Sequence, residues 1–271
     1  MIVLKVKAWR TVGAAAALGL AACGQSGDAG RAAGAGSNSG DSDAALPAPA
    51  ETIAASSGGG ESGEAGATSA FAGLSGDQLT ALRLQHLEGF VMAAERVNAA
   101  NMPAEAAVIV HQGLLEAYEG APAEFGSMNA APLRAVADGA TLTQAQMAAL
   151  LRTAEAELDR ASSRLHADGA VTTARMVDVA TGLYQNVVQA DVVDPIEYQH
   201  SMGAAFAAQA ALAAHRAELQ RRDRRAYGEA QAALADFVAL WPQTAAPEHP
   251  TAYREVLAQG SRVRLALSPY L

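Results

Sequence analysis

The sequence predicts an all-α protein whose folded part is an antiparallel helical bundle. Three observations support this fold class. Apolar residues between Ser75 and Leu271 recur at helical spacing, runs of alternating β-branched residues are missing there, and Pro, Asn or Gly interrupt the pattern at intervals suited to loops between helices. At roughly 195 residues, this stretch has the length of one domain or of two small ones.

The first part of this stretch predicts two helices joined by a tight turn. Ser75 and Gln78 have the spacing of a capping box, which marks a helix start. Asn101 and Pro103 mark the break and the start of the next helix. The stripes expected to face inward are Leu79, Leu82, His86, Phe90 and Val97 on the first helix, and Ala104, Val108, His111, Leu115 and Tyr118 on the second.

The rest of the chain predicts further helices. One short helix is expected around Leu133, and a long one that Thr143 caps and Gly169 ends. The apolar side of the long helix consists of Met147, Leu150, Leu151, Ala154, Leu158 and Leu165. Later helices are expected over residues 171–190, from Asp194-Pro195 towards Leu219, up to Trp241-Pro242, and over residues 253–267. Alanine at many inward positions predicts close packing of these helices.

The N-terminus has the pattern of an export signal. Three basic residues precede an apolar run over residues 11–22, which is about half the length needed to cross a bilayer as a helix. The run ends in Leu20-Ala21-Ala22-Cys23, which resembles the lipobox of bacterial lipoproteins. The resemblance implies a signal peptide over residues 1–22 and acylation of the Cys23 thiol. The alternative is an ordinary signal peptide followed by an incidental cysteine.

The residues after the cleavage site predict the location of the protein. Gly24 stands where an inner-membrane retention signal has Asp, so we expect the outer membrane, on its periplasmic face. The membrane is then a partner through the lipid anchor, and more than one acyl chain holds it stably. Cys23 is the only cysteine, so the exported chain has no disulfide framework.

Low-complexity sequence separates the lipid from the folded part. Residues 23–74 are rich in Gly, Ser, Ala and Asp and cannot bury enough apolar surface to fold, so we expect a flexible linker before the helical domain at residues 75–271. From Cys23 onward the chain has 16 Arg, no Lys and 28 acidic residues, a net charge of −12. That charge argues against a nucleic-acid partner and against binding to anionic lipid. The basic run over residues 221–225 is interpreted as a solvated helix end.

Catalytic motifs are missing from the sequence, and the positions of two histidines are the first clue to a site. The chain has no HExxH, CxxC, P-loop, dinucleotide fingerprint or GxSxG elbow. His86 and His111 fall on the predicted inward stripes. Counting at about 1.5 Å per residue from the turn brings His86 level with Glu116, which predicts a His–carboxylate pair. The alternative is a buried histidine hydrogen-bonded to a neighbour.

A second spacing places a carboxylate and an imidazole on one helix face. Glu197 and His200 are three residues apart, as in carboxylate-bridged metal bundles. Such bundles need two of these motifs and two further carboxylates, whereas this chain has one motif. We therefore predict a metal site made from His86, His111, Glu116, Glu197 and His200, and we do not expect a di-iron oxidase.

The same segment resembles a known family. Leu183-Tyr184-Gln185-Asn186-Val187-Val188 leads to Val192-Val193-Asp194-Pro195-Ile196-Glu197-Tyr198, which is similar to the periplasmic helical domain that accompanies bacterial high-affinity iron permeases. Trp241-Pro242 before a Pro-rich break adds to the similarity, which covers about 60 residues. The turn lacks the Asp-Gly usual in the family, and the chain has no permease helices. The resemblance implies metal handling outside the cytoplasm and carries over Tyr184, Glu197 and Tyr198 as shared positions.

Three functions are compatible with these patterns. The first is a lipid-anchored binding protein linked to iron uptake, with iron or another transition metal as its cofactor. The second is a non-enzymatic envelope scaffold with a protein partner. The third is an enzyme, which ranks last because the sequence offers no nucleophile with a matching base.

Overall fold

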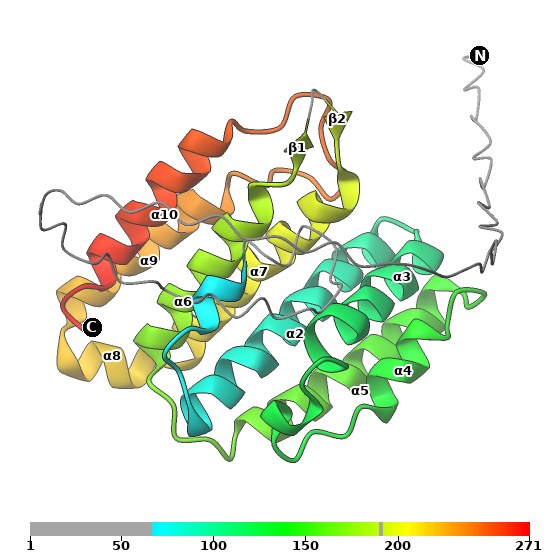
Figure 1. Ribbon diagram of the computed structural model, residues 1–271, viewed down its shortest axis with the longest axis horizontal. Coiled ribbons are helices and arrows are strands. Elements are labelled where there is room, and N and C mark those ends of the chain that lie inside the picture. The colour runs from blue at the N-terminus through cyan, green and yellow to red at the C-terminus, as the bar shows by residue number, and fades with distance from the viewer. Residues whose placement is uncertain (1–66, 190–191) are drawn as a thin grey trace, which may run out of the picture. The chain divides into compact units, whose positions relative to one another are not determined.

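The computed structural model describes residues 67–189 and 192–271, and helices make up most of them (Figure 1). The predicted all-α class is therefore confirmed. The signal peptide, Cys23 and most of the linker lie outside the described residues. The elements are η1 (Ser69–Phe71), α2 (Gly76–Ala99), α3 (Pro103–Gly113), η2 (Leu114–Tyr118), η3 (Pro122–Phe125), α4 (Ala131–Ala137), α5 (Gln144–Ser162), α6 (Gly169–Tyr184), β1 (Val188–Gln189), β2 (Val192–Val193), α7 (Pro195–Ala214), α8 (Arg216–Arg222), α9 (Arg224–Val238) and α10 (Tyr253–Leu267).

The long helices form two packed groups. Helices α2, α3, α4 and α5 pack on one another, and α6, α7, α9 and α10 form the second group (Figure 1). The groups meet where α2 packs along α7, with α6 also touching α2. One hydrophobic core runs through both groups, because their buried apolar residues form a single cluster. None of the described helices is long and apolar enough to cross a membrane.

Two glycines set the distance between α2 and α7. A Cβ atom added to Gly203 on α7 would collide with the carbonyl oxygen of Gly89 on α2. A Cβ atom on Gly89 would lie 3.1 Å from the Gly203 backbone. Backbone therefore contacts backbone at this crossing. The expected close approach of small residues is confirmed, with glycine rather than alanine at the tightest point.

Side chains define most of the helix ends. Three aspartates, Asp168, Asp194 and Asp223, each accept hydrogen bonds from two backbone N–H groups at the start of α6, α7 and α9. Thr143 and Gln146 form a complete capping box at the start of α5. The tight turn predicted before Pro103 is present, and Asn101 occupies the left-handed region there with φ 64°.

The helix start predicted at Ser75 is confirmed, because α2 begins at Gly76, but the predicted capping box is wrong. The Ser75 side chain makes no cap hydrogen bond, and Gln78 is bonded to Asp168 and Thr172 instead. The boundary predicted at Gly169 is also wrong. Helix α5 ends at Ser162, and Gly169 is the first residue of α6 rather than the end of α5. At Gly169 a Cβ atom would collide with the ring of His215, so glycine is needed there for packing.

Two further differences follow from local backbone. The helix expected over residues 171–190 ends at Tyr184, and a short antiparallel pair forms in which Val188 faces Val193 and Gln189 faces Val192. The helix expected to run from Pro195 towards Leu219 is divided at His215 into α7 and α8. The predicted helix over residues 253–267 is confirmed as α10.

The inward stripe predicted for α3 is wrong. Val108, His111 and Leu115 are exposed on the outer side of the helix. The buried side instead consists of Ala106, Ala107, Ile109, Val110, Gly113, Leu114 and Ala117. Because α3 is apolar on both sides, helical periodicity could not determine which side faces the core.

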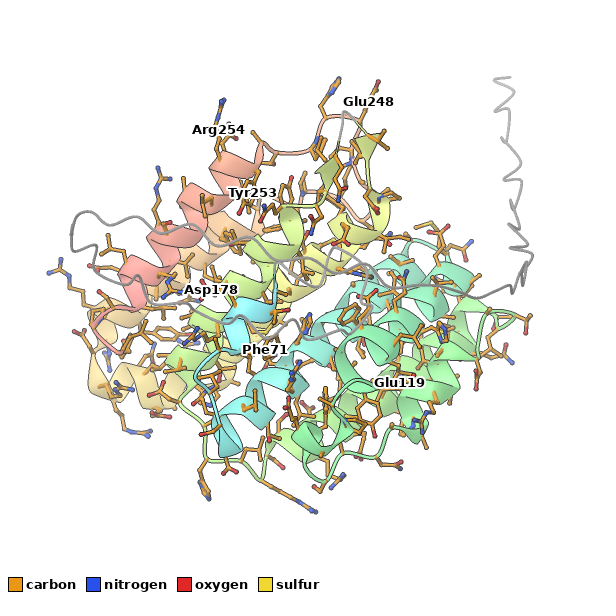
Figure 2. The ribbon with its side chains drawn as sticks, in the orientation of Figure 1. Phe71, Glu119, Asp178, Glu248, Tyr253 and Arg254 are labelled. Atoms are coloured by element: carbon orange, nitrogen blue, oxygen red, sulfur yellow. The ribbon has the colours of Figure 1, made fainter. Side chains whose placement is uncertain are left out.

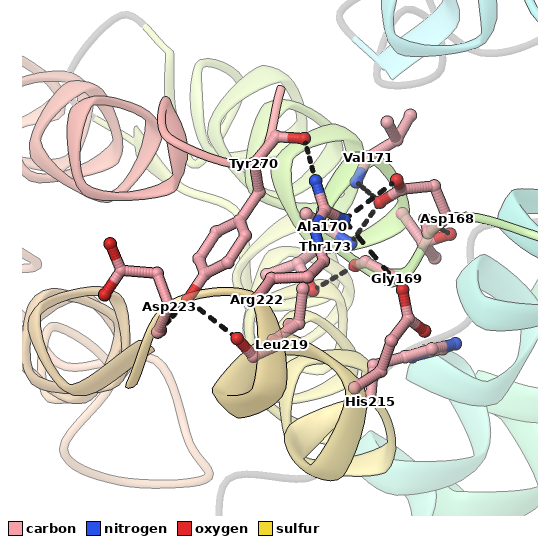
Figure 3. Close-up of polar contacts among 12 residues, drawn as sticks. Asp168, Gly169, Ala170, Val171, Thr173, His215, Leu219, Arg222, Asp223 and Tyr270 are labelled. Carbon is pink, nitrogen blue, oxygen red and sulfur yellow. Dashed lines mark hydrogen bonds and ion pairs between the residues drawn. The ribbon is translucent and has the colours of Figure 1, made fainter. Parts of the chain in front are cut away.

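A polar cluster fastens the C-terminal end to the start of α6 (Figure 3). Arg222 pairs with Asp168, the cap of α6, at 3.4 Å and donates a hydrogen bond to the carbonyl oxygen of Tyr270 at 2.9 Å. The Tyr270 hydroxyl in turn donates to the carbonyl oxygens of Leu219 and Asp223. One member of the basic run therefore has a structural role, and the turn between α8 and α9 lies against the end of α10.

The glycine crossing gives a prediction about stability. Gly203→Ala should lower the free energy of unfolding by about 2–3 kcal/mol, because the new methyl group forces α2 and α7 apart. Gly228→Ala on α9 is the matched control. No atom lies within 4 Å of its added Cβ, so this substitution should raise stability by about 0.5–1 kcal/mol. Urea denaturation of both variants measures these changes, and equal stability of Gly203→Ala and the unmodified protein would contradict the packing argument.

Candidate functional site

Two buried histidines meet where the two helix groups join. His86 on α2 is 2% exposed and His200 on α7 is 4% exposed. The ring of Phe90 lies beside both, with its centroid 5.2 Å from that of His86 and 4.7 Å from that of His200. We call Phe71, His86, Phe90 and His200 the aromatic–histidine cluster.

Glycines on three helices bring these rings together. His86 and His200 each lie three residues before a glycine of the α2–α7 crossing, so both residues lie close to the point where the two backbones approach each other. On α3, a Cβ atom at Gly113 would lie 2.6 Å from the Phe90 ring. Directly after Gly113 the chain forms a π-helical turn, η2, a widening that is frequent at functional sites.

His200 has polar partners from the second hairpin helix. Its Nε2 atom is 3.2 Å from Oε1 of Gln112, and its Nδ1 atom is 3.5 Å from Oε2 of Glu116. Burial lowers the pKa of His200 to about 4, although Asp194 acts in the opposite direction. The imidazole is therefore neutral at pH 7, so one of its ring nitrogens donates a hydrogen bond and the other can accept one.

His86 differs because neither of its ring nitrogens has a hydrogen-bond partner among the residues that the structure describes. Burial, followed by the nearby His200 and Arg83, lowers its pKa to about 3. Leaving a buried polar group unpaired costs about 1–3 kcal/mol, and such groups in native proteins commonly point to an ion, a water molecule or a ligand. His86 is thus the residue of this region with the clearest capacity for a further partner.

A small cavity lies beside the cluster. Its volume is about 250 Å³, and its walls include Thr68, Phe71, Arg83, Glu116 and Ala117. Phe71 separates the cavity from His86, with ring centroids 5.8 Å apart, and Figure 2 shows it where η1 meets α2. The Arg83 guanidinium stacks 4.2 Å from the Phe71 centroid, and its Nε donates to Glu124 at 2.7 Å. The walls of the cavity therefore include one guanidinium group, of Arg83, and one carboxylate, of Glu116, next to the histidines.

Three of the five predicted site residues come together. His86, Glu116 and His200 converge from α2, η2 and α7, whereas His111 is exposed on the outer side of α3. The predicted pair of His86 with Glu116 is wrong, because Glu116 faces His200 instead. Counting residues from the turn presumes a regular α-helix, whereas the π-helical turn η2 alters the register at Glu116.

The described residues hold no group of three or more His, Cys, Asp or Glu side chains placed to bind one metal ion. Glu197 is half-buried one turn before His200 and does not belong to such a group. The Phe90 ring packs against both imidazoles and takes up space beside each of them. The cluster is therefore not a ready-made metal-coordination shell.

Sequence reasoning missed Gln112, Arg83 and Phe71. Gln112 would have been found if the buried side of α3 had been assigned correctly, because it adjoins Gly113 and Leu114 on that side. Phe71 was assigned to the linker, yet it packs against His86. No motif in the sequence marks Arg83 or Phe71 as part of a site.

The residues of the iron-permease resemblance lie at the end of the second helix group. The Tyr184 hydroxyl donates to the Thr251 carbonyl at 2.8 Å, and the Tyr198 hydroxyl donates to the Gln243 carbonyl at 3.0 Å. Burial raises the pKa of Tyr184 to about 12. Both tyrosines therefore hold the loop between α9 and α10, and Trp241 packs edge-to-face on Tyr184 with centroids 5.4 Å apart.

Comparisons with protein-family models, with curated proteins and with solved structures gave no match to this chain. The similarity to the periplasmic domain of iron permeases therefore rests on the residues quoted above. Metal handling and lipid attachment stay predictions.

The buried histidines give a prediction about pH. In the unfolded chain both titrate near 6.5, so below that pH the unfolded state takes up protons that the folded state does not, and stability falls as the pH drops. When the pH falls from 7 to 5, we expect His86 alone to lower the free energy of unfolding by about 2 kcal/mol. Glu88, whose pKa burial raises to about 7, acts in the opposite direction over the same range.

A comparison of variants isolates the contribution of His86. When the pH falls from 7 to 5, the free energy of unfolding of His86→Leu should fall by about 2 kcal/mol less than that of the unmodified protein. Urea denaturation at both pH values, with a chelator present, measures this difference. His111→Leu is the matched control, because that imidazole is exposed. An identical pH dependence in His86→Leu and the unmodified protein would show that His86 is not held neutral.

Proposed function

We propose that this chain is a lipid-anchored binding protein of the bacterial envelope whose helical domain binds a transition-metal ion in the course of iron or other metal uptake. The observation that carries the proposal is His86, whose two buried ring nitrogens have no partner within residues 67–189 and 192–271. The convergence of His200 and Glu116 on the same region supports it. The role is one of binding, and we propose no catalytic activity.

The chemistry of the donor set suits first-row transition metals. Neutral imidazole nitrogen and carboxylate oxygen are ligands for Zn, Cu, Fe and Ni, and the lowered pKa values of both histidines leave their lone pairs free of competing protons. Because the Phe90 ring packs against both imidazoles, we expect its side chain to shift when an ion binds to both of them. A bound ion would also give His86 the partner that it lacks.

Titration calorimetry of the full chain in detergent tests metal binding. We expect one ion per chain among Fe(II), Fe(III), Zn(II) and Cu(II), and affinity reduced at least about tenfold in His86→Leu and in His200→Leu, because each removes a nitrogen ligand. His111→Leu should bind as the unmodified protein does. Flat traces for all four metals, or equal affinity in the His86 and His200 variants, would exclude the site.

The lipid anchor is the second part of the proposal. It is supported by the lipobox-like Leu20-Ala21-Ala22-Cys23 and by the long low-complexity sequence after it. Lipid attachment would hold the binding domain at the membrane while the linker lets it move away from the surface. The linker and Cys23 lie outside the described residues.

Metabolic labelling with palmitate tests the anchor. Cells that produce the unmodified chain should label it, and Cys23→Ser should abolish the label because the acylated thiol is gone. Gly24→Asp is the control: it should keep the label but shift the protein from the outer to the inner membrane fraction. Label retained in Cys23→Ser would contradict acylation at this residue.

An envelope scaffold remains the second candidate function. The outer side of α3 favours it, because Val108 and Leu115 are each about half exposed there. Together with His111 they form a stripe that a protein partner could cover. Loss of a partner on mutation of this stripe, with unchanged metal binding, would favour the scaffold.

A further inference from the structure

Charge is distributed unevenly along the helical domain. Residues 67–214 contain seven arginines and 16 acidic residues, a net charge of −9, whereas residues 215–271 contain eight arginines and six acidic residues, a net charge of +2. The positive part forms α8, α9 and α10, which lie on one side of the second helix group (Figure 1). An acidic protein thus has one segment whose net charge has the opposite sign, and the total charge does not argue against binding of that segment to anionic lipid.

Exposed apolar side chains gather in the same region. Six of the nine large apolar side chains that are exposed among the described residues belong to it or to the adjoining β1–β2 pair: Val188, Val192, Tyr253, Leu257, Leu265 and Leu271. Leu265 is 74% exposed. A hollow of about 680 Å³ has walls from both Val188 and Tyr253, so the β pair and the start of α10 form one continuous surface.

The exposed side of α10 interleaves these apolar residues with arginines. Tyr253 and Leu257 are one turn apart, and Arg254 and Arg262 are exposed on the same helix. Figure 2 shows the Arg254 side chain pointing away from the neighbouring helices. Helix α10 carries three arginines and one acidic residue, Glu255. Arg264 is paired with Asp178 on α6, and Arg262 donates a hydrogen bond to Gln259 of its own helix.

The basic run between α8 and α9 extends this surface. Tyr270 bonds to the carbonyl oxygens of Leu219 and Asp223, which fixes the end of α10 beside the run (Figure 3). Arg222 is used in that structural contact, and Arg225 pairs with Glu229. For Arg221 and Arg224, which are both exposed, no ion pair occurs among residues 67–189 and 192–271.

We infer that the α10 surface, defined as the exposed residues of α10, the basic run of residues 221–225 and the β1–β2 pair, docks the domain on a membrane whose lipids carry anionic headgroups. Exposed Leu and Tyr with interspersed Arg are the composition of surface helices that bind at the lipid interface. Arginines near an anionic bilayer are attracted to it, and the attraction weakens as salt rises. An acidic protein partner would meet the arginines but would leave Leu257 and Leu265 without an apolar environment.

The inference does not depend on metal binding or on acylation of Cys23. An acylated cysteine would bring the α10 surface near a bilayer, but the surface has the charge and apolar area to bind one without it. The test therefore uses the full chain with Cys23→Ser, in which an introduced cysteine is the only thiol.

The experiment compares two equally exposed positions. A polarity-sensitive fluorophore is attached to Leu257→Cys on α10 or to Val108→Cys on α3, where the native side chains are 48% and 49% exposed. Each labelled chain is added to vesicles of phosphatidylcholine, with or without one-third phosphatidylglycerol, that contain lipids with a quencher in the acyl chain. Any insertion by the N-terminal apolar run is common to both samples, so only the difference between the two positions is interpreted.

We expect the Leu257 fluorophore to shift to the blue and to be quenched in the vesicles with phosphatidylglycerol, at least threefold more than the Val108 fluorophore. The difference should disappear at high salt and in the double variant Arg221→Glu, Arg254→Glu. Arg134→Glu on α4 with Arg152→Glu on α5 changes the net charge equally but lies in the first helix group, so it should leave the response unchanged.

Equal responses at the two positions, or a Leu257 response that is independent of lipid charge, would overturn the inference. Absence of any response in vesicles would also overturn it and would leave a protein as the partner of this surface.

Discussion

The contact of Gly89 with Gly203 is the constraint on which the rest of the domain depends. Because no side chain separates α2 from α7, the two helix groups share one core rather than forming separate bundles. The same contact fixes the height at which His86 and His200 face Phe90. A larger residue at either glycine would therefore alter the connection between the groups and the histidines together.

The buried histidines are costly in this position, and their location indicates why they are tolerated. Desolvation keeps both imidazoles neutral, and only His200 recovers polar contacts, from Gln112 and Glu116. The cost at His86 falls beside the α2–α7 crossing, where backbone contacts backbone and many apolar contacts stabilise the surrounding structure. A buried polar side chain that lacks a partner among the described residues and is held by a rigid core is an arrangement typical of ligand-binding sites.

The sequence predicted the fold class and the long helices because local signals agree with the tertiary structure there. Asn101, Pro103, Thr143 and Asp194 act where they are predicted to act. Errors arose where tertiary contacts override local signals, as for Gln78, which bonds to the start of α6 rather than capping α2. Of the site, His86 and His200 could be predicted from spacing. The partner of Glu116 could not, because the π-helical turn changes the direction of that side chain.

The short turn η1 lies against the aromatic–histidine cluster. Ala67 and Ala70 are buried, and Phe71 packs against both the His86 ring and the Arg83 guanidinium. The environment of the buried imidazole therefore depends on a short segment at the start of the described residues as well as on the long helices α2 and α7.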